Sequence, residues 1–409
     1  MSASLVVDPV PPAPRWLQWV AGVSLVISVF SAQYVAAIME AVGLLGGWIN
    51  LMLFFPLIAV GIWSLRRETF WGGSQWVLAL FALFVVRALL GDHFLSGLSR
   101  SFALSIVFFW WVLLRRYPDL LDVLTEVGMV SMIVMFGLYL LLPGQVGLSP
   151  NPILILCVFY RWIRPSKRPW ARSAMVGVGW TLFAILLLVL STFRSPVLAV
   201  VAGCAVVALR LREARWTLIL GGLFAAVVLM AAPRQQSVSY GREIDRNNIV
   251  ERYEGAGDDR LSGRGDYWEN AIELMNERPE VWLWGVGPSE TDYFMAEANP
   301  QVLYYTRGER AVHTHNLLLE LIIGMGFLGP LLLFLWIVQV LARVPWTSPT
   351  MGLFVAVLVM NTGNVLIFDT SGGALVFAAF MVMSDRKWFD RVFPARTVST
   401  LSAPGKPIR

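Results

Sequence analysis

The chain reads HTHNLLLELIIGMGFLGPL over residues 313–331, directly after the longest polar stretch of a mostly apolar sequence. His313 and His315 therefore lie where a loop in water meets a predicted membrane helix. Imidazole is the side chain that exchanges a proton most readily near neutral pH. Polar groups at a membrane boundary are costly, and they often mark a functional site. This boundary is therefore the first candidate for a catalytic site.

The composition is typical of an all-α, polytopic membrane protein. Hydrophobic residues make up 57% of the 409 residues and charged residues only 14%, whereas a soluble domain has about 25% charged residues. Twelve apolar segments are long enough, or nearly so, to cross roughly 30 Å of hydrocarbon. They cover residues 16–38, 43–64, 74–91, 96–114, 121–142, 149–163, 173–192, 194–210, 215–232, 316–341, 349–368 and 371–385. The first has no small-residue cleavage site, so we expect a retained helix.

The loop cations predict the orientation in the membrane, because cytoplasmic loops carry an excess of Lys and Arg. Every second connection is rich in cations, and so is the C-terminal tail; the cations include Arg66, Arg67, Arg115, Arg116, Arg161, Arg164, Lys167, Arg210, Arg212, Arg343, Arg386 and Lys387. The alternate connections at 39–42, 92–95, 143–148 and 369–373 contain none. We therefore expect both termini in the cytoplasm of a multi-pass inner-membrane protein. The net charge of +5 reflects this topology, and nothing indicates nucleic acid.

One long loop, residues 233–312, falls on the periplasmic side of this plan. It separates predicted transmembrane helices 1–9 (residues 1–232) from helices 10–12 (313–385), and a cytoplasmic tail follows (386–409). The loop holds nine Arg, no Lys and 15 of the chain's 27 acidic residues. Arginine offers a planar fork of donors suited to phosphate and stays charged when partly desolvated.

The loop is predicted to be partly helical. Residues 264–278 place Tyr267, Ala271, Leu274 and Met275 on one face of a helix, and Pro279 is expected to end it. The sequence WLWGVGP at 282–288 indicates a turn-rich apolar plug.

A second loop helix is predicted over residues 289–298, SETDYFMAEA, before Pro300. Ser289 and Asp292 have the spacing of a capping box.

Three roles are open for the histidine pair. His313 and His315 could be half of a metal site, but two ligands are too few for structural zinc, so we expect no metal. They could be structural residues of the interface, or they could bind substrate and catalyse. Asn316 follows directly, and Glu320 lies one turn into the helix. Glu320 could contact substrate, or it could be a buried partner that orients the histidine or the loop.

Two arginines outside this stretch are candidates for anion binding. Arg194 lies between two apolar runs in LSTFRSPVLAV, where an arginine can also simply extend to the headgroups. Arg264 stands at the start of the predicted loop helix, where free N–H donors and the helix dipole favour an anion. Its plain alternative is a solvated loop cation. Two separated arginines that converge near one histidine would suit a diphosphate.

Other features narrow the class of function. The intramembrane charges Arg87, Asp92 and Glu126 are predicted to be structural. The chain has no Walker motif, dinucleotide fingerprint or nucleophile elbow, which argues against ATP hydrolysis. A carrier stays open as an alternative; it predicts pseudo-symmetric halves and interrupted helices, and the sequence shows neither.

Four motifs together resemble the superfamily of O-antigen ligases and O-antigen polymerases. They are an Arg after a Ser/Thr-rich helix end (Leu190–Ser195), a Gly-Arg before an aromatic-rich helix (Gly263–Trp268), WGVGP at 284–288, and His-Thr-His-Asn before LLLELIIGMGFLGPLLL. The plan of twelve helices with one large outer loop is also similar. The likeness is specific over residues 190–335, and over 1–190 it concerns topology only.

The resemblance implies a GT-C-like membrane fold and transfer of a glycan from an undecaprenyl diphosphate carrier on the periplasmic face. It implies inversion at the anomeric carbon by single displacement, with no metal and no cofactor. It assigns the catalytic residues His315, Arg194 and Arg264, and with the neighbouring residues we expect substrate binding by Arg194, Arg264, His313, Asn316 and Glu320.

The first expectation within the superfamily is an O-antigen ligase, whose acceptor is a sugar of lipid A–core. The single large loop favours it. The alternative is a polysaccharide polymerase, whose acceptor is another lipid-linked repeat. The alternative from another class is a transporter of lipid-linked glycans.

Overall fold

The computed structural model describes most of the predicted helical bundle and half of the outer loop. The main described ranges are 12–30, 75–141, 152–163, 194–209, 264–300, 314–344, 349–363 and 372–385, and the remainder are residues 183, 305–306, 309–310, 365 and 388. The predicted segments 43–64 and 215–232 lie outside the described residues, and of 173–192 only residue 183 lies within them.

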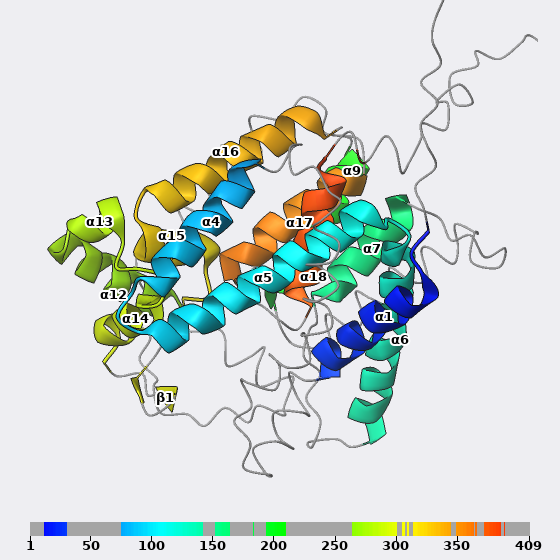
Figure 1. The fold of residues 1–409 in the computed structure, drawn as a ribbon, viewed down its shortest axis with the longest axis horizontal. Coiled ribbons are helices and arrows are strands. Elements are labelled where there is room, and N and C mark those ends of the chain that lie inside the picture. The colour runs from blue at the N-terminus through cyan, green and yellow to red at the C-terminus, as the bar shows by residue number, and fades with distance from the viewer. Residues whose placement is uncertain are drawn as a thin grey trace, which may run out of the picture.

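The described chain is helical apart from one two-residue antiparallel hairpin, which confirms the all-α prediction for this part of the protein (Figure 1). The helices before the outer loop are α1 (Arg15–Phe30), α4 (Gln75–Leu89), α5 (Phe94–Arg116), α6 (Leu120–Leu141), α7 (Ile153–Ile163) and α9 (Arg194–Leu209). The loop contains α12 (Arg264–Glu277), α13 (Glu280–Trp284), α14 (Thr291–Ala298), β1 (Tyr305–Thr306) and β2 (Glu309–Arg310). After it come α15 (Leu317–Met325), α16 (Leu328–Arg343), α17 (Pro349–Gly363) and α18 (Gly373–Met383).

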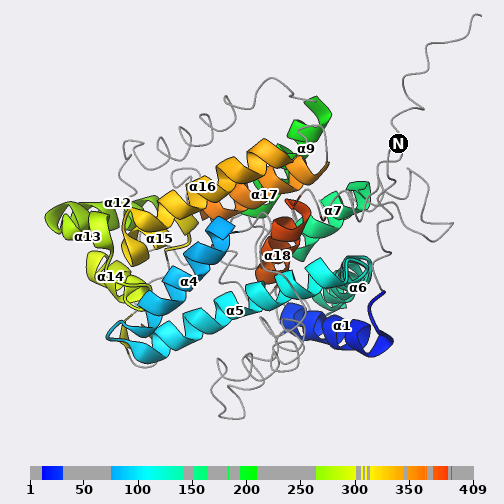
Figure 2. The same ribbon diagram turned by 45° about the horizontal axis from the view of Figure 1, so that its top comes forward.

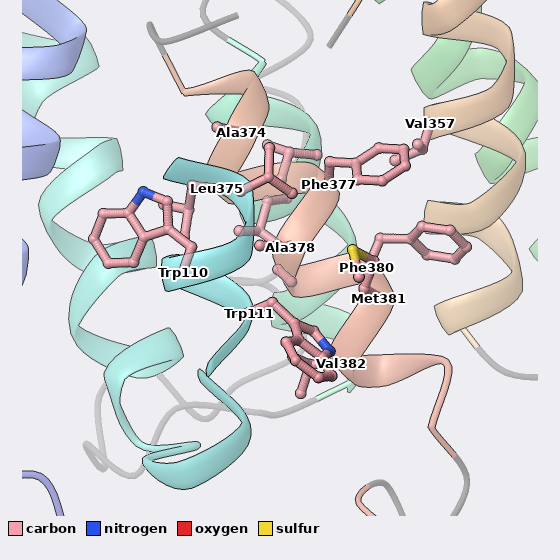
Figure 3. Packing of buried hydrophobic residues seen from close by; sticks show 14 of the residues in the cluster. Trp110, Trp111, Val357, Ala374, Leu375, Phe377, Ala378, Phe380, Met381 and Val382 are labelled. Carbon is pink, nitrogen blue, oxygen red and sulfur yellow. The ribbon is translucent and has the colours of Figure 1, made fainter. Parts of the chain in front are cut away.

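Helix α18 forms the centre of the bundle. Its sequence GALVFAAFMVM is apolar on every face, which is the pattern of a helix buried on all sides, and all its residues are buried. It packs against α5, α7 and α17, and Figure 3 shows Trp110 and Trp111 of α5 beside α18. Trp336 of α16 closes the cluster, with its ring centroid 5.4 Å from that of Phe377.

Helix α5 joins the two ends of the bundle. Its 23 residues span about 34 Å. Just before its start, the backbone N–H of His93 donates to Glu290 of the outer loop. Near its end, the carbonyl of Arg115 accepts from the indole of Trp388. The loop helices α12–α14 therefore gather at one end of the bundle (Figures 1 and 2), and the end of α5 that contacts Trp388 lies at the other.

The segment 316–341 was predicted as one membrane helix, and this prediction is wrong. Helix α15 ends after nine residues at Gly326, whose φ of +63° is a left-handed conformation that suits glycine. The N–H of Phe327 donates 2.8 Å to the carbonyl of Trp282 in the outer loop, and α16 begins at Leu328. The N–H of Phe327 thus bonds to the outer loop instead of to a carbonyl of its own helix. The interruption between α15 and α16 therefore depends on a tertiary contact.

Two of the described helical stretches are long and apolar enough to cross a membrane, Ser96–Arg116 and Leu120–Leu138. Shorter apolar helices lie at Gln75–Leu89, Leu328–Arg343, Thr350–Thr362 and Gly373–Met383. These helices agree with a membrane protein, and the number of spans stays a prediction.

The amphipathic helix predicted at 264–278 is confirmed as α12. Trp268, Ala271 and Met275 are buried along it, in a small core shared with α14 and α15. It ends at Glu277, two residues before Pro279. This core attaches the outer loop to the start of α15.

The predicted capping box of the second loop helix is wrong. Helix α14 begins at Thr291 after Glu290, and no side chain caps its first turn. The Ser289 hydroxyl donates 3.0 Å to Glu290 Oε1 instead. Asp292 forms an ion pair with Arg100, because a partly buried carboxylate gains more from a cation than from a backbone N–H.

The predicted apolar plug at 282–288 is only partly buried. Its first residues form the end of α13, where Leu283 and Trp284 are exposed. The following turn packs inward, and the N–H of Val286 donates 2.7 Å to the carbonyl of Ile323 in α15. Glycines at 285 and 287 adopt φ of +68° and +111° to make this turn.

Candidate active site

Thr314 is fixed from two sides at the point where the outer loop enters α15. Its backbone carbonyl accepts a 2.7 Å hydrogen bond from the indole nitrogen of Trp268, one turn into α12. Its hydroxyl donates 2.7 Å to Oε2 of Glu320. Both Thr314 and Glu320 are buried, so these bonds form away from water. Breaking either bond would leave a buried polar group without a partner, which is costly. The two bonds therefore hold Thr314 in this position.

Asn316 is fixed as firmly on the other side of His315. It is the N-cap of α15, with its side-chain oxygen accepting 3.1 Å from the N–H of Leu319. Its amide nitrogen donates 3.3 Å to the carbonyl of Thr362, near the end of α17. Asn316 therefore joins the start of α15 to the end of α17.

His315 stands between these two anchors in a left-handed backbone conformation. Its φ is +51°, the only positive φ of a non-glycine residue in the described chain. Such a conformation costs about 1–3 kcal/mol and persists where the surrounding contacts over-determine it. Thr314 and Asn316 provide those contacts. The histidine is partly exposed, so its imidazole is held at a defined place without being enclosed.

A buried ion-pair cluster lies behind this segment. Arg100 of α5 pairs through Nη2 with Oδ1 of Asp292 at 2.6 Å and through Nη1 with Oε1 of Glu320. The Arg100 and Asp292 side chains are each 12% exposed, and that of Glu320 is 3% exposed. The cluster connects α5, α14 and α15. Glu320 also accepts a hydrogen bond from the Thr314 hydroxyl, so the cluster is linked to Thr314.

The sequence interpretation missed the role of Arg100. Arg100 lies inside the predicted segment 96–114, and an arginine there needs a partner. The sequence therefore indicated that Arg100 has a partner. It did not indicate which one, because Asp292 and Glu320 are about 200 residues away in the sequence. The interpretation singled out Arg87 instead, which donates to the carbonyls of Trp284 and Gly285. That contact agrees with a structural role for Arg87.

The structure brings together three of the predicted site residues. His315, Asn316 and Glu320 share the first turn of α15 and the segment before it. Arg194 is the first residue of α9 and Arg264 the first residue of α12, and their side chains lie outside the part of the chain that is described. His313 also lies outside it. The assignment of all six residues to a site therefore stays a prediction.

The helices that begin with the two arginines are both connected to this segment. Trp268 of α12, four residues after Arg264, holds the Thr314 carbonyl. Helix α9 packs along α17, where a Cβ on Gly203 would lie 2.5 Å from the carbonyl oxygen of Gly352. Such an approach needs a residue without a side chain. Helix α17 in turn reaches Asn316 through Thr362.

Within the described residues, no three or more His, Cys, Asp or Glu side chains group closely enough to hold a metal ion. Because His313 lies outside those residues, the metal alternative for the histidine pair is not tested. The polar groups that the structure does place near His315 are a carboxylate already paired with Arg100, a hydroxyl and an amide.

Residues 179–335 match the family model described as O-antigen ligase. No curated protein and no solved structure matches the chain. The matched region runs from before α9 into α16, so it contains Arg194, Arg264 and His315. Members of this family are membrane-associated proteins of glycosyltransferase type that act on lipid-linked polysaccharides. The region that carries the segment Thr314–Asn316 is therefore similar to an O-antigen ligase domain, which supports the resemblance to the superfamily of O-antigen ligases and O-antigen polymerases.

Proposed function

We propose that the protein is an O-antigen ligase-type glycosyltransferase of the bacterial inner membrane. It moves a glycan from undecaprenyl diphosphate to a sugar hydroxyl of lipid A–core on the periplasmic face. The observation that carries the proposal is the left-handed His315 between two anchored neighbours, at the point where α12, α15 and α17 are joined by hydrogen bonds. A partly exposed imidazole on a backbone held in this way is suited to accept one proton.

The two arginines are proposed to bind the diphosphate of the donor. Each begins a helix, where free N–H groups and the helix dipole add to the positive charge. Trp268 places the start of α12 near Thr314. An antiparallel pairing of α9 with α17 would set Arg194 level with Asn361, because Gly203 lies against Gly352. Arg194 and Arg264 would then approach the His315 segment from two sides.

The reaction balances with these groups. The acceptor hydroxyl oxygen attacks the anomeric carbon, and its proton passes to the imidazole of His315. The bond from the anomeric carbon to the phosphate oxygen breaks, and the electron pair leaves on the lipid diphosphate. Guanidinium groups held in place stabilise the charge that grows on those oxygens. A single displacement inverts the anomeric carbon and needs no ATP, since the donor is already activated.

Ligase and polymerase share this chemistry and differ in the acceptor. The test is to give purified protein a defined lipid-linked glycan together with either lipid A–core or a second lipid-linked repeat, in excess EDTA. We expect glycosylated lipid A–core. Elongation of the lipid-linked repeat would instead identify a polymerase. Activity that is lost in EDTA and restored by Mg²⁺ or Mn²⁺ would contradict the metal-independent mechanism.

The same preparation tests the carrier alternative. The interruption at Gly326 is one of the two features that a carrier predicts, contrary to the expectation of unbroken helices. The protein should therefore also be placed in vesicles with the lipid-linked glycan. Movement of the glycan lipid across the bilayer without transfer to either acceptor would overturn the glycosyltransferase proposal.

The loop end of the bundle is proposed to face the periplasm. The backbone N–H of Ala13 donates 3.0 Å to the carboxylate of Asp119. Arg115, close to this turn, contacts Asp385 and Trp388 near the other terminus. Described residues near both termini, Ala13 and Trp388, thus contact the cation-rich α5–α6 turn and the end of α5, which supports a common cytoplasmic side.

Single cysteines at Ser239 and Ser166 test this orientation, in a chain whose Cys157 and Cys204 are replaced by alanine. In intact spheroplasts, a membrane-impermeant thiol reagent is expected to label position 239. Position 166 should react only after permeabilisation. Labelling at 166 and not at 239 would reverse the orientation.

A further inference from the structure

We propose that Arg100 is a positioning residue for His315, a role that rests on the proposed function of that histidine. The chain of contacts is short and complete: Arg100 pairs with Glu320, Glu320 accepts from the Thr314 hydroxyl, and Thr314 directly precedes His315. Arg100 does not need to contact substrate for this role. It acts by holding the peptide segment that carries the base.

The geometry of the guanidinium explains why an arginine is suited to this position. Its two terminal nitrogens reach two different carboxylates, Asp292 on α14 and Glu320 on α15. A planar fork of donors can bridge two acceptors at fixed angles, whereas an ammonium group is a point charge on a flexible stem. Arg100 therefore sets the position of α14 and of α15 relative to the membrane helix α5.

The burial of the cluster makes the link stiff. The Glu320 side chain is 3% exposed, so water cannot easily replace Arg100 or Thr314 as its partner. If Glu320 moves, Thr314 loses the acceptor of its hydroxyl, which is one of the two hydrogen bonds that fix this residue directly before His315. The left-handed conformation at His315 would then relax towards a more favourable φ and carry the imidazole away from its place.

A second observation supports a role beyond folding. The outer loop is also attached to the bundle through the backbone of His93 to Glu290, and α12 to α14 through Arg278 and Glu297. These contacts lie away from Thr314. The Arg100 cluster, in contrast, joins α5 through Glu320 to the residue next to the histidine. Its loss should affect turnover more than attachment of the loop.

The variants must avoid a trivial loss of folding. Removing Arg100 alone would take the cation away from two buried carboxylates, which is strongly destabilising. Arg100→Lys keeps the charge and loses the bridge. A neutral triple variant, Arg100→Met with Asp292→Asn and Glu320→Gln, removes the cluster without leaving a buried charge. Arg278→Lys is the matched control, since Arg278 pairs with Glu297 at the surface of the same loop.

For the purified variants we expect kcat to fall about 10- to 100-fold in Arg100→Lys, the range that a small misplacement of a catalytic group causes. The KM for the lipid-linked donor should change little, and Arg278→Lys should behave as wild type. In a His315→Asn background, Arg100→Lys should add almost no further loss, because both changes act through one group. Independent, multiplicative losses, or a rise in KM with unchanged kcat, would overturn the positioning role.

Hydrogen exchange separates failure of this proposal from failure of the proposed function. In Arg100→Lys and in the triple variant, amides of peptides covering residues 314–320 should exchange faster than in wild type, and in Arg278→Lys they should not. This readout does not depend on glycosyl transfer. If wild type transfers no glycan but exchange rises as expected, the function is wrong and the structural link stands. Unchanged exchange in both cluster variants would overturn the link itself.

Discussion

Replacing His315 with asparagine is expected to lower turnover about 10²- to 10⁴-fold, the usual contribution of a general base. Donor binding should remain, because Arg194 and Arg264 are unchanged. Asparagine is chosen because it tolerates the left-handed conformation that the structure gives this position. The substitution therefore removes the base and keeps the turn. Turnover and the affinity for fluorescently labelled lipid-linked glycan are the two measurements.

A matched glycine variant isolates the backbone role of the same position. If His315 served only to make the turn into α15, then His315→Gly would keep near-normal turnover, since glycine adopts a positive φ without strain. We expect it to be as inactive as His315→Asn. His313→Ala should keep a substantial fraction of turnover. An inactive His313→Ala beside an active His315→Asn would reverse the assignment of the base.

The pH dependence distinguishes a base from an anchor. An imidazole accepts a proton only when it is neutral, so turnover of wild type should fall as acidification protonates His315. The residual turnover of His315→Asn should lack that acid limb. If His315→Asn instead loses donor binding together with turnover, the histidine anchors the substrate and does not transfer the proton.

Replacing Arg264 with lysine is expected to lower turnover by about 10²-fold or more, comparable to the loss of one oxyanion donor. Lysine keeps the positive charge at the start of α12 but has no fork for two phosphate oxygens. The same result is expected for Arg194→Lys at the start of α9. Folding should survive, because lysine keeps the positive charge and a long apolar stem.

Arg278→Lys is a close control for Arg264→Lys. The two arginines lie at opposite ends of α12, and Arg278 donates 3.1 Å to Glu297 at the surface. We expect Arg278→Lys to keep wild-type turnover. Near-normal turnover in Arg264→Lys, measured beside it, would show that Arg264 is a solvated loop cation and not a diphosphate ligand.

Local patterns in the sequence were sufficient for the features that depend on neighbouring residues. The helix at 264–277 follows from the spacing of Tyr267, Ala271, Leu274 and Met275, and of this predicted face Ala271 and Met275 are buried. The family match at 179–335 agrees with the motifs recognised over 190–335. These features depend on periodicity and local motifs, which involve residues close together in the sequence.

Contacts between residues far apart in the sequence could not be predicted from it. The division of 316–341 at Gly326 depends on the carbonyl of Trp282, and hydropathy alone predicts a continuous helix there. The capping box at Ser289 failed because Asp292 has a stronger partner in Arg100, on a helix nearly 200 residues earlier.

The sequence by itself determined that this is an apolar, all-helical chain with a histidine and an asparagine at the start of α15. Only the tertiary structure decided how that histidine is held: the left-handed φ at His315, the bond from Trp268 to Thr314, and the Arg100 cluster behind Glu320. The physical reason is that burial makes each polar group depend on a partner, and the partner is chosen by how helices pack in space. Hydrophobic spacing specifies which face of a helix is buried, but not which distant charge it will meet.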